Sequence, residues 1–181
     1  IGRISRILVR LHWSMLLVAA YFLYTFSDNL KLGVLVILAL FGSVLLHELG
    51  HCWGARRVGG DAREILLWPL GGLAMIHAPM RPWPQFFSTL TGPLTNVLII
   101  ALTVPIFVLA GGDAWAFVPG VDGSFSPTLG LLFLYYLVQV NLVMAIFNIV
   151  PAFPLDGGRM LQAALWPKFG FHKATTVAVY L

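Results

Sequence analysis

Four long apolar runs limit what this chain can fold into more than any other feature of its sequence. They cover residues 11–27, 32–55, 86–110 and 129–150, and a helix of roughly 20 apolar residues is long enough to cross a bilayer. Only 10% of the residues are charged, against about 25% in ordinary soluble domains. We therefore predict an α-helical, multi-pass membrane protein with a bundle of four full spans. A nucleic-acid-binding protein is excluded, although the formal net charge is +4.

The segments after the fourth run are too short to cross a membrane. Residues 154–165 form one such segment, and residues 174–181 resemble the first turns of a further spanning helix. Because the chain begins at Ile1 rather than at a methionine, we expect it to be the core of a longer protein. Residues 1–181 are predicted to form a single transmembrane domain.

Basic residues gather on one side of the predicted membrane domain. Every Lys and Arg except Lys31 falls on the N-terminal side, whereas the opposite side holds Lys31, Asp28, Asp113 and Asp122. Loops rich in Lys and Arg stay on the cytoplasmic side of a membrane. We therefore predict a cell-membrane protein with a cytoplasmic N-terminus and an external loop at residues 111–128.

Between the second and third runs lies a segment that is too apolar for a solvated loop and too short to span. In residues 64–78, two short apolar stretches flank Pro69, Leu70, Gly71 and Gly72. Proline and glycine in this arrangement indicate a turn between two strands. We predict a short membrane-associated β-hairpin that dips into the cytoplasmic leaflet, where protein shields its backbone.

The second run contains the motif His47-Glu48-Leu49-Gly50-His51. Residues four apart lie on one helix face, so His47 and His51 can offer their imidazoles to one metal ion. Glu48 lies where a carboxylate can take a proton from a water molecule on that metal. Counting back from Arg56 places His47 roughly 13 Å below the cytoplasmic surface, in the cytoplasmic half of the bilayer. Ionisable groups are costly at that depth, which favours a functional site over a chance occurrence or structural polar residues.

A catalytic zinc ion takes three protein ligands and keeps one position open, so a third ligand must reach the two histidines. Asp156 is favoured because it lies in a proline-broken segment, residues 148–158, that ends the fourth run on the same side as the histidines. The alternative for Asp156 is a helix N-cap, and both roles could coexist. The other residues considered as the third ligand are His77, Glu64, Asp61, His12 and Cys52. Asp61 and Glu64 are expected to form solvated ion pairs, and His12 and His77 are expected to lie at the membrane interface.

Two other classes of membrane protein also use histidines. A haem protein needs axial ligands from opposite faces of the ring, whereas His47 and His51 share one helix face. A metal transporter would use His47, Glu48, His51 and Asp156 as a transit site. Such a site usually lies near the bilayer midplane and opens to both sides. The transporter remains the alternative function.

Five segments of the chain together match a known family pattern. Two carry most of the match: residues 47–51, and residues 147–159 with the sequence Phe-Asn-Ile-Val-Pro-Ala-Phe-Pro-Leu-Asp-Gly-Gly-Arg. Residues 9–14, 69–74 and 91–96 support it. The chain resembles the site-2 protease family of zinc intramembrane metalloproteases.

This resemblance implies a zinc metalloendopeptidase with one Zn²⁺ ion per chain. Its substrate would be a single-pass membrane protein, cut within or near the transmembrane segment in the lipid bilayer. The residues that would bind zinc are His47, His51 and Asp156. Glu48 would activate the water. Asn148 matches a polar family position near the zinc that helps hold the substrate or the oxyanion, with a helix-terminal hydrogen bond as its alternative role. Asn96 is interpreted as a helix-packing residue.

The predicted hairpin offers a further substrate contact. An extended substrate can add as a strand to the edge of residues 66–75, which compensates the helical hydrogen bonds that it loses. The substrate-binding candidates there are Gly71, Gly72, Leu73 and Ala74. The short loops resemble the family branch that carries CBS domains after the last span. Such domains would lie outside residues 1–181, and no oligomeric state is predicted.

Overall fold

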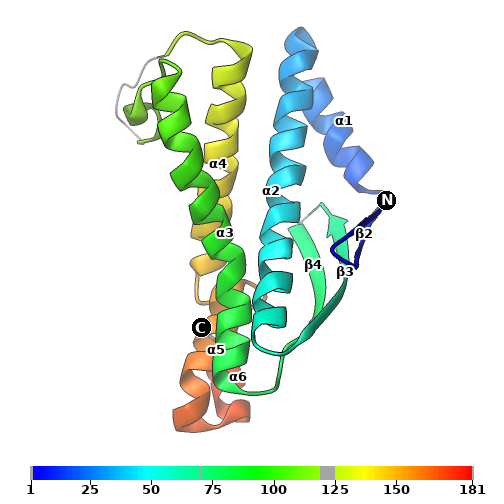
Figure 1. Ribbon diagram of the computed structural model, residues 1–181, viewed down its shortest axis with the longest axis vertical. Helices are drawn as coiled ribbons and strands as arrows, with labels where there is room; N and C mark the ends of the chain where they lie inside the picture. The colour runs from blue at the N-terminus through cyan, green and yellow to red at the C-terminus, as the bar shows by residue number, and fades with distance from the viewer. Residues whose placement is uncertain (1, 70, 119–124, 181) are drawn as a thin grey trace.

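Three long helices form the body of the protein. The computed structural model describes residues 2–69, 71–118 and 125–180. Its long helices are α2 (Leu30–Arg57), α3 (Pro82–Leu109) and α4 (Leu129–Ile149), and each is long and apolar enough to cross a membrane. They run side by side in Figure 1, with α3 in contact with both α2 and α4. These helices correspond to the second, third and fourth predicted spans.

The first predicted span needs correction. Residues 11–27 do not form one helix: Leu11 ends a strand, and α1 covers only Met15–Thr25. At 1.5 Å per residue those 11 residues rise about 16 Å, half the thickness of a bilayer core. Figure 1 shows α1 lying beside one half of α2, to which it is joined by the short helix η1 (Ser27–Asn29). Within the described residues, three helices rather than four reach spanning length.

A four-stranded sheet packs beside α2. Its strands are β1 (Gly2–Ile4), β2 (Ile7–Leu11), β3 (Asp61–Trp68) and β4 (Gly71–His77), and they lie in that order across the sheet. β3 and β4 pair antiparallel, as the predicted hairpin requires, and Leu70 between them lies outside the described residues. The N-terminal pair was not predicted: β1 pairs antiparallel with β2, and β2 runs parallel to β3.

The sheet is attached to α2 by an apolar core. One sheet face buries Ile7, Val9, Ile65 and Leu67 against Val44 and its neighbours on α2. Cys52 lies in the same core as a free thiol that is 1% exposed, which removes it from the candidate ligands. Since this core fixes the sheet to the histidine-bearing part of α2, it also fixes where β4 lies.

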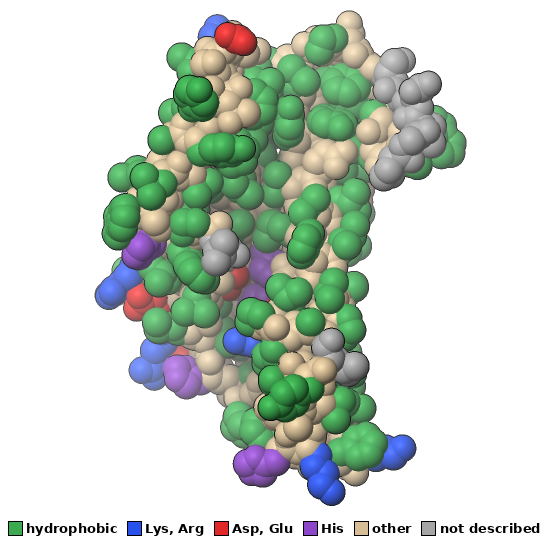
Figure 2. Space-filling model, turned by 180° about the vertical axis from the view of Figure 1, so that it is seen from behind, with side chains coloured by type: hydrophobic (Ala, Val, Ile, Leu, Met, Phe, Trp, Pro, Cys, Tyr) green, Lys and Arg blue, Asp and Glu red, His purple; other side chains and the backbone are tan. Residues whose placement is uncertain are grey.

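Two short helices follow α4 on the side of the molecule where α2 ends. They are α5 (Asp156–Phe169) and α6 (Phe171–Tyr180), and α5 packs against α3. α5 is below spanning length, as predicted for residues 154–165, and α6 continues to the end of the described residues. At the opposite end, the predicted 111–128 loop contains the short helix η2 (Ala114–Phe117), while residues 119–124 lie outside the described part. In Figure 2, hydrophobic side chains cover the long helices, and nearly all visible Lys and Arg side chains lie in the half that holds α5 and α6.

Candidate metal centre

Helix α2 presents the two motif histidines to the same point. His47 and His51 are one turn apart, and their Nε2 atoms lie 3.1 Å from each other. Both side chains are buried, and their rings meet edge to face. The predicted convergence of the two imidazoles is therefore present in the fold.

Asp156 completes the cluster from the first turn of α5. Its Oδ2 lies 3.2 Å from His47 Nε2 and 3.1 Å from His51 Nε2. The N-cap of α5 is Leu155, and no side chain caps the helix, so the structure does not give Asp156 the capping role. Burial tends to raise the pKa of Asp156, but the two histidines that face its carboxylate outweigh burial and hold that pKa below its ordinary value.

The other candidate ligands lie elsewhere. Among the described residues, the one group whose ligand atoms converge is His47, His51 and Asp156, all within 4.8 Å of one another. Asp61 pairs with Arg63 at 2.7 Å and Glu64 with Arg10 at 3.0 Å, as expected for solvated ion pairs. The remaining histidines stay out of the cluster: His12 bonds Ser14, and His77 pairs with Asp61 in the strand register.

Each histidine is oriented through its other ring nitrogen. His51 Nδ1 lies 2.9 Å from the backbone carbonyl of Ser88, and His47 Nδ1 lies 2.5 Å from the side-chain oxygen of Asn96. Because both partners accept, each Nδ1 carries a hydrogen, and each Nε2 is the nitrogen left to face Asp156 and a metal ion. Asn96 therefore orients His47 in addition to packing α3 in the bundle, and the sequence did not predict this second role.

Helix α3 approaches the imidazoles closely because it has a glycine there. A Cβ atom on Gly92 would lie 2.3 Å from Nε2 of His51 and 2.9 Å from Nε2 of His47. Ordinary contacts of a Cβ atom begin near 3.4 Å. Only glycine leaves room for both rings at this crossing.

Glu48 lies beside the cluster and faces strand β4. Its side chain is 6% exposed, and its Oε2 accepts a 2.9 Å hydrogen bond from the Ala74 N–H. The backbone of Gly72 comes so close that a Cβ atom there would lie 2.2 Å from Cγ of Glu48. The carboxylate is thus held next to the three converging ligand atoms without belonging to them.

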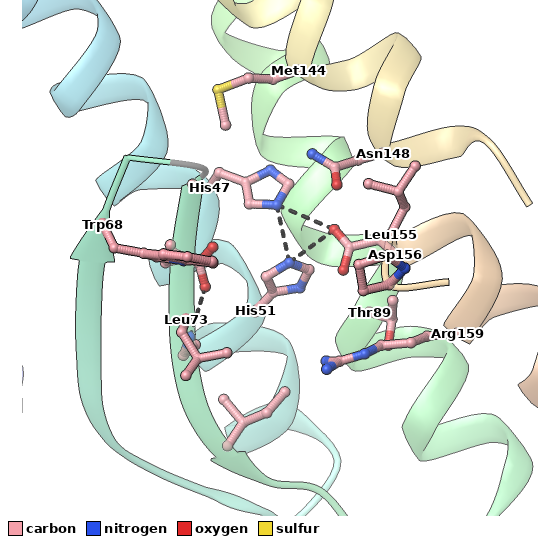
Figure 3. Close-up of a pocket in the computed structure, with 16 residues that line it drawn as sticks. His47, His51, Trp68, Leu73, Thr89, Met144, Asn148, Leu155, Asp156 and Arg159 are labelled. Atoms are coloured by element: carbon pink, nitrogen blue, oxygen red, sulfur yellow. Dashed lines mark hydrogen bonds and ion pairs between the residues drawn. The ribbon is translucent and has the colours of Figure 1, made fainter. Parts of the chain in front are cut away.

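The cluster and Glu48 open into a pocket of about 250 Å³ between β4 and the α4–α5 connection (Figure 3). Figure 2 shows histidine and acidic atoms at the floor of a hollow between the two sides of the molecule. Every predicted substrate-binding residue lines this pocket: Gly71, Gly72, Leu73, Ala74 and Asn148.

Arg159 also lines the pocket and was not predicted to do so. It lies on α5 one turn after Asp156, is exposed, and forms no ion pair within the described residues. Residues three apart share a helix face, so this spacing from the aspartate is the sequence signal that could have identified it.

The chemistry of the cluster suits a catalytic zinc ion. Two imidazole nitrogens and one carboxylate oxygen form a ligand set that catalytic zinc sites use, with a fourth position left for water. The hydrogen bonds at both Nδ1 atoms are the outer contacts that metal-bound histidines commonly make. The residues present therefore fit the ion.

The comparisons with known proteins agree with this site. The model of Peptidase family M50 matches residues 35–181. The Zinc metalloprotease MJ0392 of Methanocaldococcus jannaschii is 35% identical over 97% of this chain and 48% of its own length. The Rip3 protein of Mycobacterium tuberculosis is 28% identical over 94% of this chain and 44% of its own. The chain thus spans about half the length of these relatives.

A solved structure gives the same result for the fold. The Site-2 Protease from Methanocaldococcus jannaschii superimposes with a TM-score of 0.71 at 30% identity, covering 98% of this chain and 76% of that one. The resemblance predicted from the sequence motifs is confirmed, and the chain belongs to Peptidase family M50.

Proposed function

We propose that this chain is an intramembrane zinc metalloendopeptidase that hydrolyses a peptide bond within or near the transmembrane segment of a single-pass membrane protein. The observation that carries the proposal is the arrangement around Glu48: a buried carboxylate faces the pocket beside three converging ligand atoms but is not one of them. Membership of Peptidase family M50 supports the same reaction class.

One zinc ion per chain would be held by His47 Nε2, His51 Nε2 and the carboxylate of Asp156. When bound, zinc supplies Lewis-acid chemistry that polarises a peptide carbonyl and makes water a better nucleophile. The Asn96 and Ser88 oxygens keep both Nε2 lone pairs available for it.

Glu48 is the proposed general base and acid. It takes a proton from the attacking water and gives it to the amine that leaves when the peptide bond breaks. Its hydrogen bond from the Ala74 N–H fixes the carboxylate in the pocket while the proton moves. Gly72 is required beside it because a larger residue would displace the carboxylate.

Strand β4 is the proposed substrate-binding edge. It is the last strand of the sheet and, within the described residues, pairs with β3 alone, while residues 71–74 line the pocket. A helical substrate hides its carbonyls in its own hydrogen bonds, so it must unwind before cleavage. Pairing of the unwound segment with β4 would replace the lost bonds. Asn148, on the far side of the pocket, is the proposed partner of the substrate carbonyl or the oxyanion.

We further propose that the N-terminus is cytoplasmic and that the pocket lies in the cytoplasmic half of the bilayer. The basic residues at the α5 and α6 end support this orientation by the positive-inside rule. The β3–β4 hairpin would then lie in the cytoplasmic leaflet. Water would reach the pocket from that side.

The test uses the purified chain reconstituted in vesicles with a single-pass membrane protein. Zinc-loaded protein should cleave the substrate, a chelator should stop cleavage, and added zinc should restore it. The same vesicles should show no zinc uptake beyond that of empty ones. Zinc uptake without any cleavage would support the alternative, a metal transporter with the same residues as its transit site.

A further inference from the structure

A chain of buried polar side chains runs through the helix bundle to His47. Ser43 on α2, Asn141 on α4 and Asn96 on α3 are all 0% exposed. Asn141 Nδ2 donates to Ser43 Oγ, and Asn96 Nδ2 donates to Asn141 Oδ1, each at 2.8 Å. Asn96 Oδ1 then accepts from His47 Nδ1 at 2.5 Å. Three helices thus contribute to one hydrogen-bonded path that ends on a proposed zinc ligand.

The order of donors and acceptors along this hydrogen-bonded path is set at Asn141. Asn141 Nδ2 also donates to the backbone carbonyl of Leu137 at 2.8 Å. A carbonyl can only accept, so the amide nitrogen of Asn141 must face it. The reversed amide would put two acceptors together in a buried site, at the cost of an unsatisfied pair. The Oδ1 of Asn141 is therefore forced to face Asn96.

The orientation of Asn141 determines that of the Asn96 amide, which in turn determines where the ring hydrogen of His47 lies. Because Asn141 presents an acceptor, Asn96 must turn its nitrogen toward α4 and its oxygen toward His47. Facing that oxygen, His47 must carry a hydrogen on Nδ1, so Nε2, which faces Asp156, is the nitrogen that can bind zinc. His51 needs no such path because its Nδ1 bonds the Ser88 carbonyl directly.

We infer that Asn141 is a positioning residue for the metal centre: through Asn96 it fixes the tautomer of His47 that can bind zinc. Without Asn141, the Nδ2 of Asn96 keeps on α4 only its weak 3.8 Å contact with Met144 Sδ, and the two orientations of the Asn96 amide become comparable. In the reversed orientation Asn96 donates to Nδ1, and the ring hydrogen moves to Nε2, where it opposes zinc binding. This inference rests on the proposed zinc site.

The first test compares two single variants of the full chain in detergent, with zinc affinity measured by chelator competition. Asn141→Leu should weaken zinc binding about 10-fold or more, the range seen when outer contacts of metal ligands are lost. Ser43→Ala is the matched control: a hydroxyl both donates and accepts, so it does not set the direction of the path. Ser43→Ala should stay within about 3-fold of the wild type. Wild-type affinity in Asn141→Leu would overturn the inference.

A double-mutant cycle separates positioning from packing. An aspartate at position 96 can only accept from His47, so Asn96→Asp fixes the tautomer without Asn141. Adding Asn141→Leu to Asn96→Asp should then lower zinc affinity by less than about 3-fold, since it also removes the Asn141 Oδ1 that would face the new carboxylate. An equal loss in both backgrounds would show that Asn141 acts by packing alone and would overturn the inference.

A third readout needs no variant. Nitrogen NMR of the metal-free wild type, with ¹⁵N-labelled histidine, should show a hydrogen on Nδ1 of His47, whether or not Nε2 is also protonated toward Asp156. A His47 ring without a hydrogen on Nδ1 would overturn the inference even if zinc still binds. A wild type that binds no zinc at all would instead overturn the metal centre of the proposed function, so the two failures are distinguishable.

Discussion

Gly92 gives the sharpest test of the metal centre, because one added carbon should remove metal binding without replacing any ligand residue. A Cβ atom at this position would lie 2.3 Å from both Cε1 and Nε2 of His51. Ordinary contact begins at 3.4 Å, so the ring of His51 must retreat by about 1 Å, whereas metal–ligand distances tolerate only ~0.2 Å. We therefore expect Gly92→Ala to lose His51 as a ligand.

The size of the expected fall in zinc affinity follows from the loss of His51 as a ligand. Disturbing an outer contact of a metal ligand costs about 10- to 100-fold in affinity, so loss of a ligand should cost at least 100-fold, or about 2.7 kcal/mol. The helix itself should tolerate the change, since alanine is favoured over glycine in a helix interior by up to about 1 kcal/mol. Zinc affinity should fall while α3 stays intact.

The assay is a zinc competition titration run beside thermal unfolding. Gly42→Ala is the control: it makes the same substitution within a long helix, but no atom lies within 4 Å of the added carbon. Gly42→Ala should bind zinc like the wild type. If Gly92→Ala also binds zinc like the wild type, the two histidine rings do not converge against α3 as described.

Three further predictions concern the ligand, the base and the strand edge. Asp156→Ala should lower zinc content to near zero by elemental analysis, and full retention would mean that Asp156 is not a zinc ligand. Gly72→Ala should displace Glu48, so cleavage of a membrane substrate should fall at least about 10-fold with zinc content unchanged. Proline at Leu73 or Ala74 should impair cleavage by removing a backbone donor, at Ala74 also by releasing Glu48, whereas Leu73→Ala should matter less. Proline variants as active as the wild type would exclude strand addition.

The helical part of the fold was predictable because it depends on local composition. Three uninterrupted apolar runs gave α2, α3 and α4 within a few residues of their ends. The prediction failed at residues 11–27, where the apolar run continues through a strand, a turn and a short helix without a change in composition. Hydropathy alone cannot separate these elements.

The N-terminal strands depend on contacts that are distant in sequence. β2 pairs with β3 more than fifty residues later, with Val9 opposite Ile65. The turn between β1 and β2 places Ser5 and Arg6 at positive φ, a conformation that usually calls for glycine or asparagine. Neither feature leaves a recognisable turn signal in the sequence.

The site residues also divide into those that local sequence predicts and those that depend on contacts distant in sequence. His47, Glu48 and His51 were assigned from helical spacing, which is local, and Asp156 from its motif. Asn96 was interpreted as a packing residue because a lone asparagine in an apolar helix carries no sign of its partner. Its contact with His47 joins residues 49 positions apart, and only the packing of α2 on α3 creates it.

The central claim is that Glu48 acts as a base beside the metal and not as a ligand to it. Glu48→Gln keeps the size of the side chain and an oxygen that can accept from Ala74, but removes the basic carboxylate. The measurement is zinc stoichiometry and cleavage of a single-pass membrane substrate, side by side for wild type and variant. We predict unchanged zinc content, a fall in cleavage of about 10²- to 10⁴-fold, and accumulation of uncleaved substrate in complex with the variant. Cleavage at the wild-type rate would contradict the proposed mechanism.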